Sequence, residues 1–504
     1  MIRRLLIIAL LVLVLTLASL FLPARQVTIK GIGTLSFETT VTLSVGSEAA
    51  YASPGWLSGW TYRKSHIINS ATGAGTNYQV KVKVYYGSGT SSGENVYLGS
   101  KCRTDFGDVR FTDDDQTTLL DYWMQEKVDS NYAIFWVEVA DDLGTAGTIY
   151  IYYGKSVATT TSSGVNTFDF FDDFNDNSID TTKWQTFNGT WSETTDVMRQ
   201  TSTATQDPKK CIAKSAPTGN NYAFRAKVRV DSGTNTDERG GVSIKNNTTD
   251  GYAYNYVFHN HSTKNQVQFL NDMVAWGTAY TYSWVFGTWY WFEITTYGGS
   301  NVYGRCWTIT ATEPSFNSQA WTGRTGYPAL NGGSFNGTHS FDDAFMRKYV
   351  SPEPSHGAWG SEEPATPSIY DTPISKGFGT VQPSTTYWSN VVGTPSSPLD
   401  NDHCFFTVTN NGNCTVNITI KASVFGGGVG WTLGTPAQNV ARITAFKSGD
   451  SIPGGVVLTT GEQSFIPALA DGSSKKWEIK LETPTSFTDG VQKSSTITLT
   501  ATFA

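Results

Sequence analysis

The sequence predicts an all-β protein, with three β-sandwich modules behind one N-terminal transmembrane or signal helix. Past residue 25, apolar residues alternate with polar ones at the two-residue period of strands, and helical periodicity is essentially absent. Charged residues make up only 16% of the chain, against about 25% in typical soluble domains. Gly, Ser, Thr, Asn, Tyr and Trp replace them, which is typical of secreted β-rich proteins.

The first element, residues 1–25, contains an apolar run from Leu5 to Leu22 that follows Arg3 and Arg4. A run of this length can cross a bilayer as a helix, and the arginines favour a cytoplasmic N-terminus with the rest of the chain outside. A cleaved signal is the alternative, although signals have shorter apolar cores and end in small residues. We therefore expect an extracytoplasmic protein at the cell surface, membrane-anchored through Leu5–Leu22 or secreted.

Residues 26–50 form a linker with strand periodicity, in which Leu35 and Phe37, then Val41, Leu43 and Val45, alternate with polar residues. This segment has no obvious partner close in sequence. We expect it to pair with a distant domain or, by strand addition, with a neighbouring molecule.

The first module, residues 51–160, contains predicted strands at 78–84, 133–139 and 148–153. Four segments resemble the family called domain of unknown function 2341, a module of archaeal and bacterial surface proteins. They are residues 60–64 (WTYRK), 102–113 (CRTDFGDVRFTD), 122–123 (YW) and 149–154 (IYIYYG). The family has no assigned activity, so the resemblance implies a surface context and no chemistry.

The second module, residues 165–351, consists of many short strands between Gly, Asn and Ser turns, which predicts a two-sheet jelly roll. It opens with residues 170–180 (FFDDFNDNSID), closes near residues 341–349, and includes the strand 288–294 (TWYWFEI). These segments resemble the concanavalin A-like, or laminin-G-like, lectin domains. The resemblance implies carbohydrate binding.

A Pro-rich linker at residues 352–373 precedes the third module, residues 374–504, which we expect to be an immunoglobulin-like sandwich. Two alternating runs, one with Phe406 and Val408 and one from Val416 to Ile420, predict a hairpin across Cys404–Val424. Ile497, Leu499, Ala501 and Phe503 predict the closing strand.

The acidic opening of the second module is a candidate calcium site, because calcium prefers oxygen ligands. In lectin-like jelly rolls the first and last strands lie close together, which would add an aspartate from the closing segment. The alternative is a solvated turn, since Asp and Asn also favour turn geometry. A bound ion would be structural. The predicted ligands are Asp172, Asp173, Asn175, Asp176 and Asp343.

Aromatic residues crowd residues 276–291 and are candidates for stacking on sugar rings. Core packing competes with this interpretation, and we expect at least half of these rings to be core. In a strand, Trp289 and Trp291 share one face while Tyr290 takes the other. The candidate glycan-binding residues are Trp276, Tyr280, Tyr282, Trp284 and Trp289.

Five cysteines are too few for a disulfide scaffold, and Cys211 with Cys306 is the candidate pair. A Cys404–Cys414 bridge is disfavoured, because the expected hairpin register separates them by about 13 Å.

Asn246 and several other residues match the N-glycosylation pattern. The candidates are Asn188, Asn247, Asn260, Asn336, Asn413 and Asn417.

No catalytic set is predicted. The GTSSG run at residues 89–93 matches a nucleophile elbow, yet no helix follows it. A net charge of −7 without a basic cluster gives no support for nucleic-acid binding. We expect a non-catalytic surface protein that binds surface glycans, or adheres to other cell-surface proteins, through the lectin-like module. The alternative is a structural subunit of a surface layer or filament assembled by strand donation, and a glycoside hydrolase is less expected.

Overall fold

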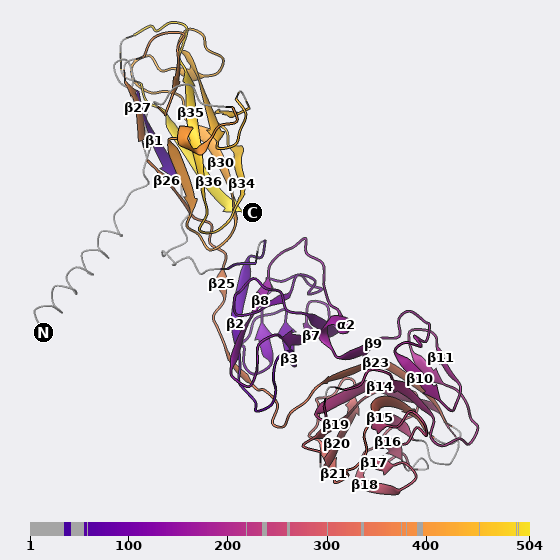
Figure 1. Ribbon diagram of the computed structural model, residues 1–504. Helices are drawn as coiled ribbons and strands as arrows, with labels where there is room; N and C mark the ends of the chain where they lie inside the picture. Colours follow the sequence, from indigo (N-terminus) through magenta and orange to yellow (C-terminus); the bar gives the residue numbers. More distant parts are fainter. Residues whose placement is uncertain are drawn as a thin grey trace, which may run out of the picture. The chain divides into compact units, whose positions relative to one another are not determined.

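The computed structural model has two compact units, each nearly all β (Figure 1). The central unit comprises Arg63–Asp114 and Thr118–Glu362, and the second comprises Met1–Tyr62, Asp115–Thr117 and Glu363–Ala504. The structure describes residues 35–41, 55–57, 59–217, 219–233, 239–259, 263–299, 301–333, 337–373, 375–379, 381–390, 397–452, 454–489, 491 and 493–504. Within these ranges, every helix is too short or too polar to cross a bilayer. The helix predicted at residues 1–25 lies outside them.

The first module of the central unit is a sandwich of two sheets, in the strand orders β24-β2-β8-β5 and β4-β3-β7-β6. The three predicted strands are confirmed as β3, β7 and β8. The expected linker at 352–373 is partly wrong, because β24 lies within it and pairs with β2. The strands are β2 (Tyr62–Ile68), β3 (Tyr78–Tyr85), β4 (Asn95–Tyr97), β5 (Arg110–Thr112), β6 (Tyr122–Val128), β7 (Tyr132–Val139), β8 (Gly147–Tyr153) and β24 (His356–Trp359).

The second module is the predicted two-sheet jelly roll. A seven-stranded sheet, β10-β13-β22-β15-β16-β17-β18, faces an eight-stranded sheet, β11-β12-β23-β14-β19-β20-β21 with β9 beside β23. The short helix α2 (Gly164–Thr167) precedes it. The strands are β9 (Phe170–Asp172), β10 (Trp184–Phe187), β11 (Trp191–Glu193), β12 (Met198–Gln200), β13 (Lys210–Ala213), β14 (Tyr222–Ser232), β15 (Gly240–Asn246), β16 (Tyr254–His259), β17 (Gln266–Asn271), β18 (Ala275–Thr281), β19 (Tyr290–Tyr297), β20 (Asn301–Thr308), β21 (Asn317–Gln319), β22 (Tyr327–Gly332) and β23 (Thr338–Lys348).

The two modules of the central unit are joined by a buried aromatic cluster. The alternation predicted for β19 is confirmed: Tyr290 and Phe292 pack in the jelly-roll core, whereas Trp291 faces the other way. That outer face is nevertheless buried, because Trp123 and Trp136 of the first module pack against it. The cluster is completed by Phe168, Phe171, Trp307 and Phe345.

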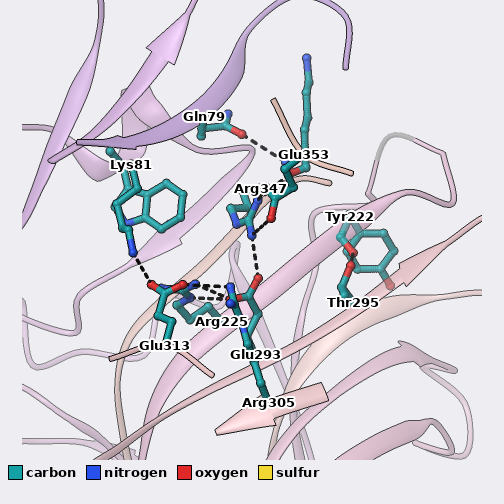
Figure 2. Close-up of polar contacts among 12 residues, drawn as sticks. Gln79, Lys81, Tyr222, Arg225, Glu293, Thr295, Arg305, Glu313, Arg347 and Glu353 are labelled. Carbon is teal, nitrogen blue, oxygen red and sulfur yellow. Dashed lines mark hydrogen bonds and ion pairs between the residues drawn. The ribbon is translucent and has the colours of Figure 1, made fainter. Parts of the chain in front are cut away.

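A buried ion network lies beside this cluster (Figure 2). Glu293 on β19 is fully buried and accepts hydrogen bonds from Arg225, Arg305 and Arg347. Its Oε1 lies 2.8 Å from Arg347 Nη2. Burial alone would raise the pKa of Glu293, but the three guanidinium groups outweigh it and hold that pKa well below its usual range. A carboxylate held by three cations stays ionised inside the protein.

The network also connects the modules directly. Glu313 of the jelly roll accepts from Arg225 Nη1 at 2.9 Å and pairs with Lys81 Nζ of β3 at the same distance. The Gln79 side-chain oxygen, also on β3, accepts from the Lys348 backbone N–H at 3.1 Å. Figure 2 shows these contacts converging from both modules. The modules therefore share one interior, and we treat them as one body.

The third module is a two-sheet sandwich, and its five-stranded sheet has the order β27-β1-β36-β30-β34. The strand β1 comes from the N-terminal linker and pairs parallel with β36 and antiparallel with β27 (Figure 1). Of the two alternatives expected for the segment 26–50, pairing with a distant domain is the one that its described residues, 35–41, adopt. The closing strand is confirmed as β36, with Ile497 and Leu499 fully buried. The strands of this sheet are β1 (Leu35–Val41), β27 (Ser375–Gly379), β30 (Val416–Ala422), β34 (Gln463–Leu469) and β36 (Thr496–Phe503).

The hairpin predicted across Cys404–Val424 is wrong. Both strands form, but β29 joins the opposite sheet, β26-β29-β35-β32-β31, while β30 pairs with β36. The buried Asn410 side chain braces the segment between the two sheets, since its amide donates to the backbone oxygens of Cys414 and Leu469. The remaining elements are β25 (Glu363–Pro364), β26 (Ile369–Thr372), β28 (Thr386–Trp388), η1 (Asn401–His403), β29 (Phe406–Asn410), β31 (Thr432–Leu433), β32 (Val440–Lys447), β33 (Val456–Val457) and β35 (Ser474–Glu482).

Candidate functional site

A groove opens beside the ends of β14, β15 and β22 in the jelly roll. It consists of two hollows of about 210 and 450 Å³, which share Asn220, Lys245 and Thr325 in their walls. The smaller hollow adds Trp321 and Arg324. Together they offer one large aromatic ring and several hydrogen-bonding groups, the combination that orients a small polar ligand.

A β-bulge directs Lys245 into the groove. The β15–β22 register shifts between Ser243 and Asn246, and Lys245 adopts a left-handed backbone conformation (φ 57°) within the shift. Its ammonium donates to Asn220 Oδ1 at 2.8 Å and lies 5.2 Å from the centre of the Tyr222 ring. Burial lowers the pKa of Lys245. The bulge places a cation, partly withdrawn from water, in the groove wall.

The opposite wall is the loop that carries Trp321, which is braced from below by Tyr254. The two rings stack with centroids 5.4 Å apart. The Tyr254 hydroxyl donates to the Thr322 backbone oxygen and accepts from the Arg324 N–H at 3.3 Å. Arg324 is also anchored, because its Nε donates to Asn271 Oδ1 at 2.8 Å. The loop is thus fixed before any ligand arrives, which reduces the entropy lost on binding.

Gly326 is required where this loop rejoins β22. Its φ is +137°, and a Cβ there would lie 2.0 Å from the Asn246 backbone oxygen. The Asn246 side-chain amide also donates to the Tyr327 backbone oxygen at 2.6 Å. Only glycine permits this close approach, which holds the loop against the bulge that carries Lys245.

The five aromatic candidates from the sequence do not line this groove. Trp284 is 1% exposed and belongs to the core, so its assignment to a binding surface is wrong. Tyr280 and Tyr282 are half-buried against the same core. Trp276 is 38% exposed but stacks on His259, and Trp289, half-buried, lies beneath Arg229. Trp321 was missed because a single tryptophan in a polar loop carries no periodic signal.

The predicted calcium ligands are not brought together. Asp172 is buried and accepts from the Trp184 indole at 2.7 Å, whereas Asp343 pairs with Lys227. Asp173 is half-buried, while Asn175 and Asp176 are exposed on the loop. Across the described ranges, no group of three or more His, Cys, Asp or Glu side chains is arranged to hold a metal. The first and last strands do meet, since Phe171 on β9 pairs with Phe345 on β23. However, Asp343, which was expected to share the ion, forms an ion pair with Lys227.

The sequence also missed Glu193, beneath the acidic loop. It is 4% exposed, and neither carboxylate oxygen has a hydrogen-bond partner within the described residues. Burial, together with the neighbouring Asp176 carboxyl and the charge of Asp172, raises the pKa of Glu193 to about 7. Its strand partner Met198 lies in the core, so Glu193 points inward, where the sequence would predict an apolar residue.

The proposed disulfide is absent. Cys211 and Cys306 are both free and buried, on opposite sheets of the jelly roll. Cys211 lies on β13. Cys306 lies on β20 of the other sheet, and β20 packs against β16. In the seven-stranded sheet, β16 is three strand spacings from β13. That offset is about 14 Å, too far for a disulfide. Cys102, Cys404 and Cys414 are free as well.

The glycosylation candidates differ in accessibility. Asn188 and Asn247 are exposed, and Asn413 and Asn417 are half-buried. Asn246, which also matches the pattern, is fully buried and inaccessible to a glycan. Asn260 and Asn336 lie outside the described residues.

One family model matches the chain, that of the domain of unknown function 2341, over residues 105–187. The match confirms the resemblance seen in the first module and extends into the jelly roll as far as β10. It includes Trp123, Trp136, Phe168 and Phe171 of the aromatic cluster between the modules. No curated protein matches the sequence.

Several solved structures are similar to about a third of this chain at low sequence identity. The carbohydrate-binding module CBM66 from Bacillus subtilis is 13% identical, with 33% of this chain and 96% of that chain covered and a TM-score of 0.28. The cellulose-induced protein Cip1 is 13% identical, with 36% and 98% covered and a TM-score of 0.27. The exoplasmic/lumenal domain of VIP36, bound to Ca²⁺ and Man3GlcNAc, is 9% identical, with 33% and 84% covered and a TM-score of 0.26. At these scores the similarities support no inference about ligands.

Proposed function

We propose that the central unit binds glycans without catalysis, in the groove between Lys245 and Trp321. The observation that carries this proposal is a tryptophan, half-buried against the core and braced by Tyr254, that lines a preformed hollow together with polar groups. The apolar face of a sugar ring packs on an indole, while its hydroxyls exchange hydrogen bonds with amides and cations. No carboxylic acid is present among the described residues that line the two hollows, so an acid/base pair for glycoside hydrolysis has no support there.

The ligand class follows from the charges in the wall. Lys245 and Arg324 supply donors and positive charge, and Asn220 and three threonines supply neutral polar groups. We expect a glycan with an acidic or densely hydroxylated residue at its end, because a hollow of this size holds one or two sugar rings. The apolar run at Leu5–Leu22 supports display of this groove outside the cell.

A glycan array with the full chain in detergent tests the proposal. Trp321→Ala removes the stacking ring and is expected to lose about 1.5–3 kcal/mol, or about ten- to hundredfold in affinity. Trp276→Ala is the matched control, since this tryptophan is exposed elsewhere on the jelly roll and should bind as the parent does. A blank array for the parent, or equal affinity of Trp321→Ala and parent, contradicts the proposal.

We also propose a structural calcium ion beside Glu193, a ligand that the sequence did not predict, together with the predicted Asp172 and Asp176. The buried Glu193 carboxylate beside Asp176 and Asp172 supports a cation there, because three neighbouring carboxylates repel one another unless protonated or bound to a cation. Calcium should raise the melting temperature of the parent, and Glu193→Gln should abolish the rise. Asp180→Asn, in the same loop but bonded to Thr182, should keep it. If neither calcium nor a chelator changes the melting temperature of the parent, the proposed calcium site is refuted.

Strand donation between copies is the second candidate function, and β1 favours it. This strand lies between β27 and β36, yet the chain between it and β27 contains the whole central unit. A neighbouring copy could supply the same strand, which would link molecules into a layer or filament. A chain lacking residues 35–41 should assemble with copies that donate the strand. If that chain stays monomeric and its C-terminal unit melts as the parent's does, donation is refuted.

A further inference from the structure

Lys210, Asn255 and Asp272 meet in the jelly roll, at a place that is buried from solvent. Lys210 lies on β13 and Asn255 on β16, and both are fully buried; Asp272 directly follows β17 and is 3% exposed. None of the three lines the groove described above. A buried lysine is costly and needs an explanation.

Lys210 and Asn255 point away from the sandwich core, on the same outer face of the seven-stranded sheet. Their neighbours Cys211 and Tyr254 pack in the core, which places Lys210 and Asn255 on the opposite side. Two strands, β22 and β15, lie between them in the sheet. On this face, β22 carries Ala329, which is opposite Ile212, and β15 carries Ser243, which is opposite Asn255. Ala329 and Ser243 are also opposite each other, and their small side chains leave room for the lysine to cross.

The polar atoms of the three residues are in direct contact with one another. Lys210 Nζ donates to Asn255 Oδ1 and lies 3.3 Å from Asp272 Oδ2. The Asn255 amide is fixed, because its Nδ2 donates to the Leu270 backbone oxygen at 3.0 Å. Asp272 is fixed too, since it accepts from the Ala253 N–H at 3.1 Å. An amine, a carboxamide and a carboxyl group are thus held in contact with water excluded.

Burial also prepares the amine. Desolvation lowers the pKa of Lys210, although Asp272 opposes the shift. A neutral amine carries the lone pair that attacks a carbonyl carbon, whereas an ammonium does not. The Asp272 carboxyl oxygen Oδ2 lies 3.3 Å from Nζ, close enough for a proton to pass between them.

We propose that Lys210 and Asn255 become joined by an intramolecular isopeptide bond, with Asp272 as the catalytic proton carrier. The Nζ lone pair forms a bond to Asn255 Cγ, and the bond from Cγ to Nδ2 breaks. Asp272 accepts one proton from Nζ and delivers it to the departing Nδ2, which leaves as ammonia. The product is a secondary amide, and the balance of atoms requires no oxidant and no further reactant.

The bond would link β13 to β16 across two intervening strands. The two residues are 45 positions apart, so a loop of that length would be closed covalently. Closing it restricts the unfolded chain and resists separation of strands under load. This property suits a module displayed on a surface, and it holds whether or not the groove binds glycans.

Mass spectrometry of the full chain tests the bond. A proteolytic digest of the parent should contain one branched peptide that joins the segments around Lys210 and Asn255, lighter than their sum by one ammonia. Lys210→Arg, Asn255→Ala and Asp272→Asn should each yield the two segments unlinked. Lys209→Arg is the matched control: Lys209 is also buried, but its Nζ donates to the Ser202 backbone oxygen, and the branched peptide should persist.

Separate, unmodified segments in the digest of the folded parent overturn the proposal, and this result does not depend on whether any variant folds. If Asp272→Asn is folded and still linked, Asp272 is not the proton carrier and the mechanism is wrong. Linked protein should also melt at a higher temperature than the folded, unlinked Asp272→Asn.

Discussion

Replacing Glu293 with glutamine tests whether the buried ion network holds the two modules of the central unit together. Glutamine keeps the shape of the side chain but removes the charge that compensates Arg225, Arg305 and Arg347. Arg225 and Arg347 are each only 1% exposed, so water cannot replace the lost carboxylate. Removing one partner of a buried ion pair costs about 3–5 kcal/mol.

Two remaining carboxylates place the expected loss near the lower end of that range. Glu313 still contacts Arg225 at 2.9 Å, and Glu353 still contacts Arg347 at 3.1 Å. A loss of about 3 kcal/mol lowers the melting temperature of a large domain by about 6 °C. We also expect the single transition of the central unit to broaden or divide, because Glu313 links the network to Lys81 of the first module.

Scanning calorimetry of the full chain measures both effects, with Asp129→Asn as the control. Asp129 forms an exposed ion pair with Lys127, and such pairs contribute about 0–1 kcal/mol. Because the pKa of Glu293 is depressed, its contribution is present above the unfolded-state pKa and is lost only as the pH falls through the lower folded-state value. The parent and Glu293→Gln should therefore converge only in strong acid. Equal melting temperatures at neutral pH would refute the stabilising role of the network.

Three further outcomes are expected. Burial, with a smaller contribution from neighbouring His356, lowers the pKa of His66 to about 3. A depressed histidine pKa makes the folded state lose stability as the pH falls below about 6.5. In urea titrations between about pH 6.5 and 3, His66→Phe should reduce this slope, and His339, whose pKa burial also lowers to about 3, should account for part of what remains. Thr40→Pro interrupts β1 between its two partner strands and should lower the melting temperature of the C-terminal unit alone, by calorimetry; a shift in the central unit instead would contradict this assignment. Gly326→Ala should displace the loop that carries Trp321 and weaken glycan binding more than it lowers the melting temperature.

Local patterns predicted local elements well. The alternation in residues 78–84 and 133–139 predicted β3 and β7 within one residue at each end, because a half-buried strand must alternate. The motif segments of the first module anticipated the family match at residues 105–187. The same local logic predicted β29 and β30 but paired them wrongly, because their actual partners, β35 and β36, lie far away in sequence.

The candidate site was not predictable in this way. Lys245 enters the groove through a register shift, and Trp321 is oriented by Tyr254 from a strand far away in sequence. For the acidic loop, the composition predicted a metal site that the side chains do not form. Asp172 instead accepts from Trp184 and Asp343 pairs with Lys227, and no local pattern reveals these partners. Side-chain partners depend on which segments the fold brings together.

By itself, the sequence determined that this protein is built of strands, has its modules in this order and carries one apolar run at Leu5–Leu22. Each of these properties depends on residues that are neighbours along the chain. Only the tertiary structure decided that β1 completes the C-terminal sandwich, that two modules share one interior, and that Lys210 lies against Asn255. Those contacts join surfaces from distant segments, and they form because burying apolar area and pairing buried polar groups lowers the free energy of the whole fold.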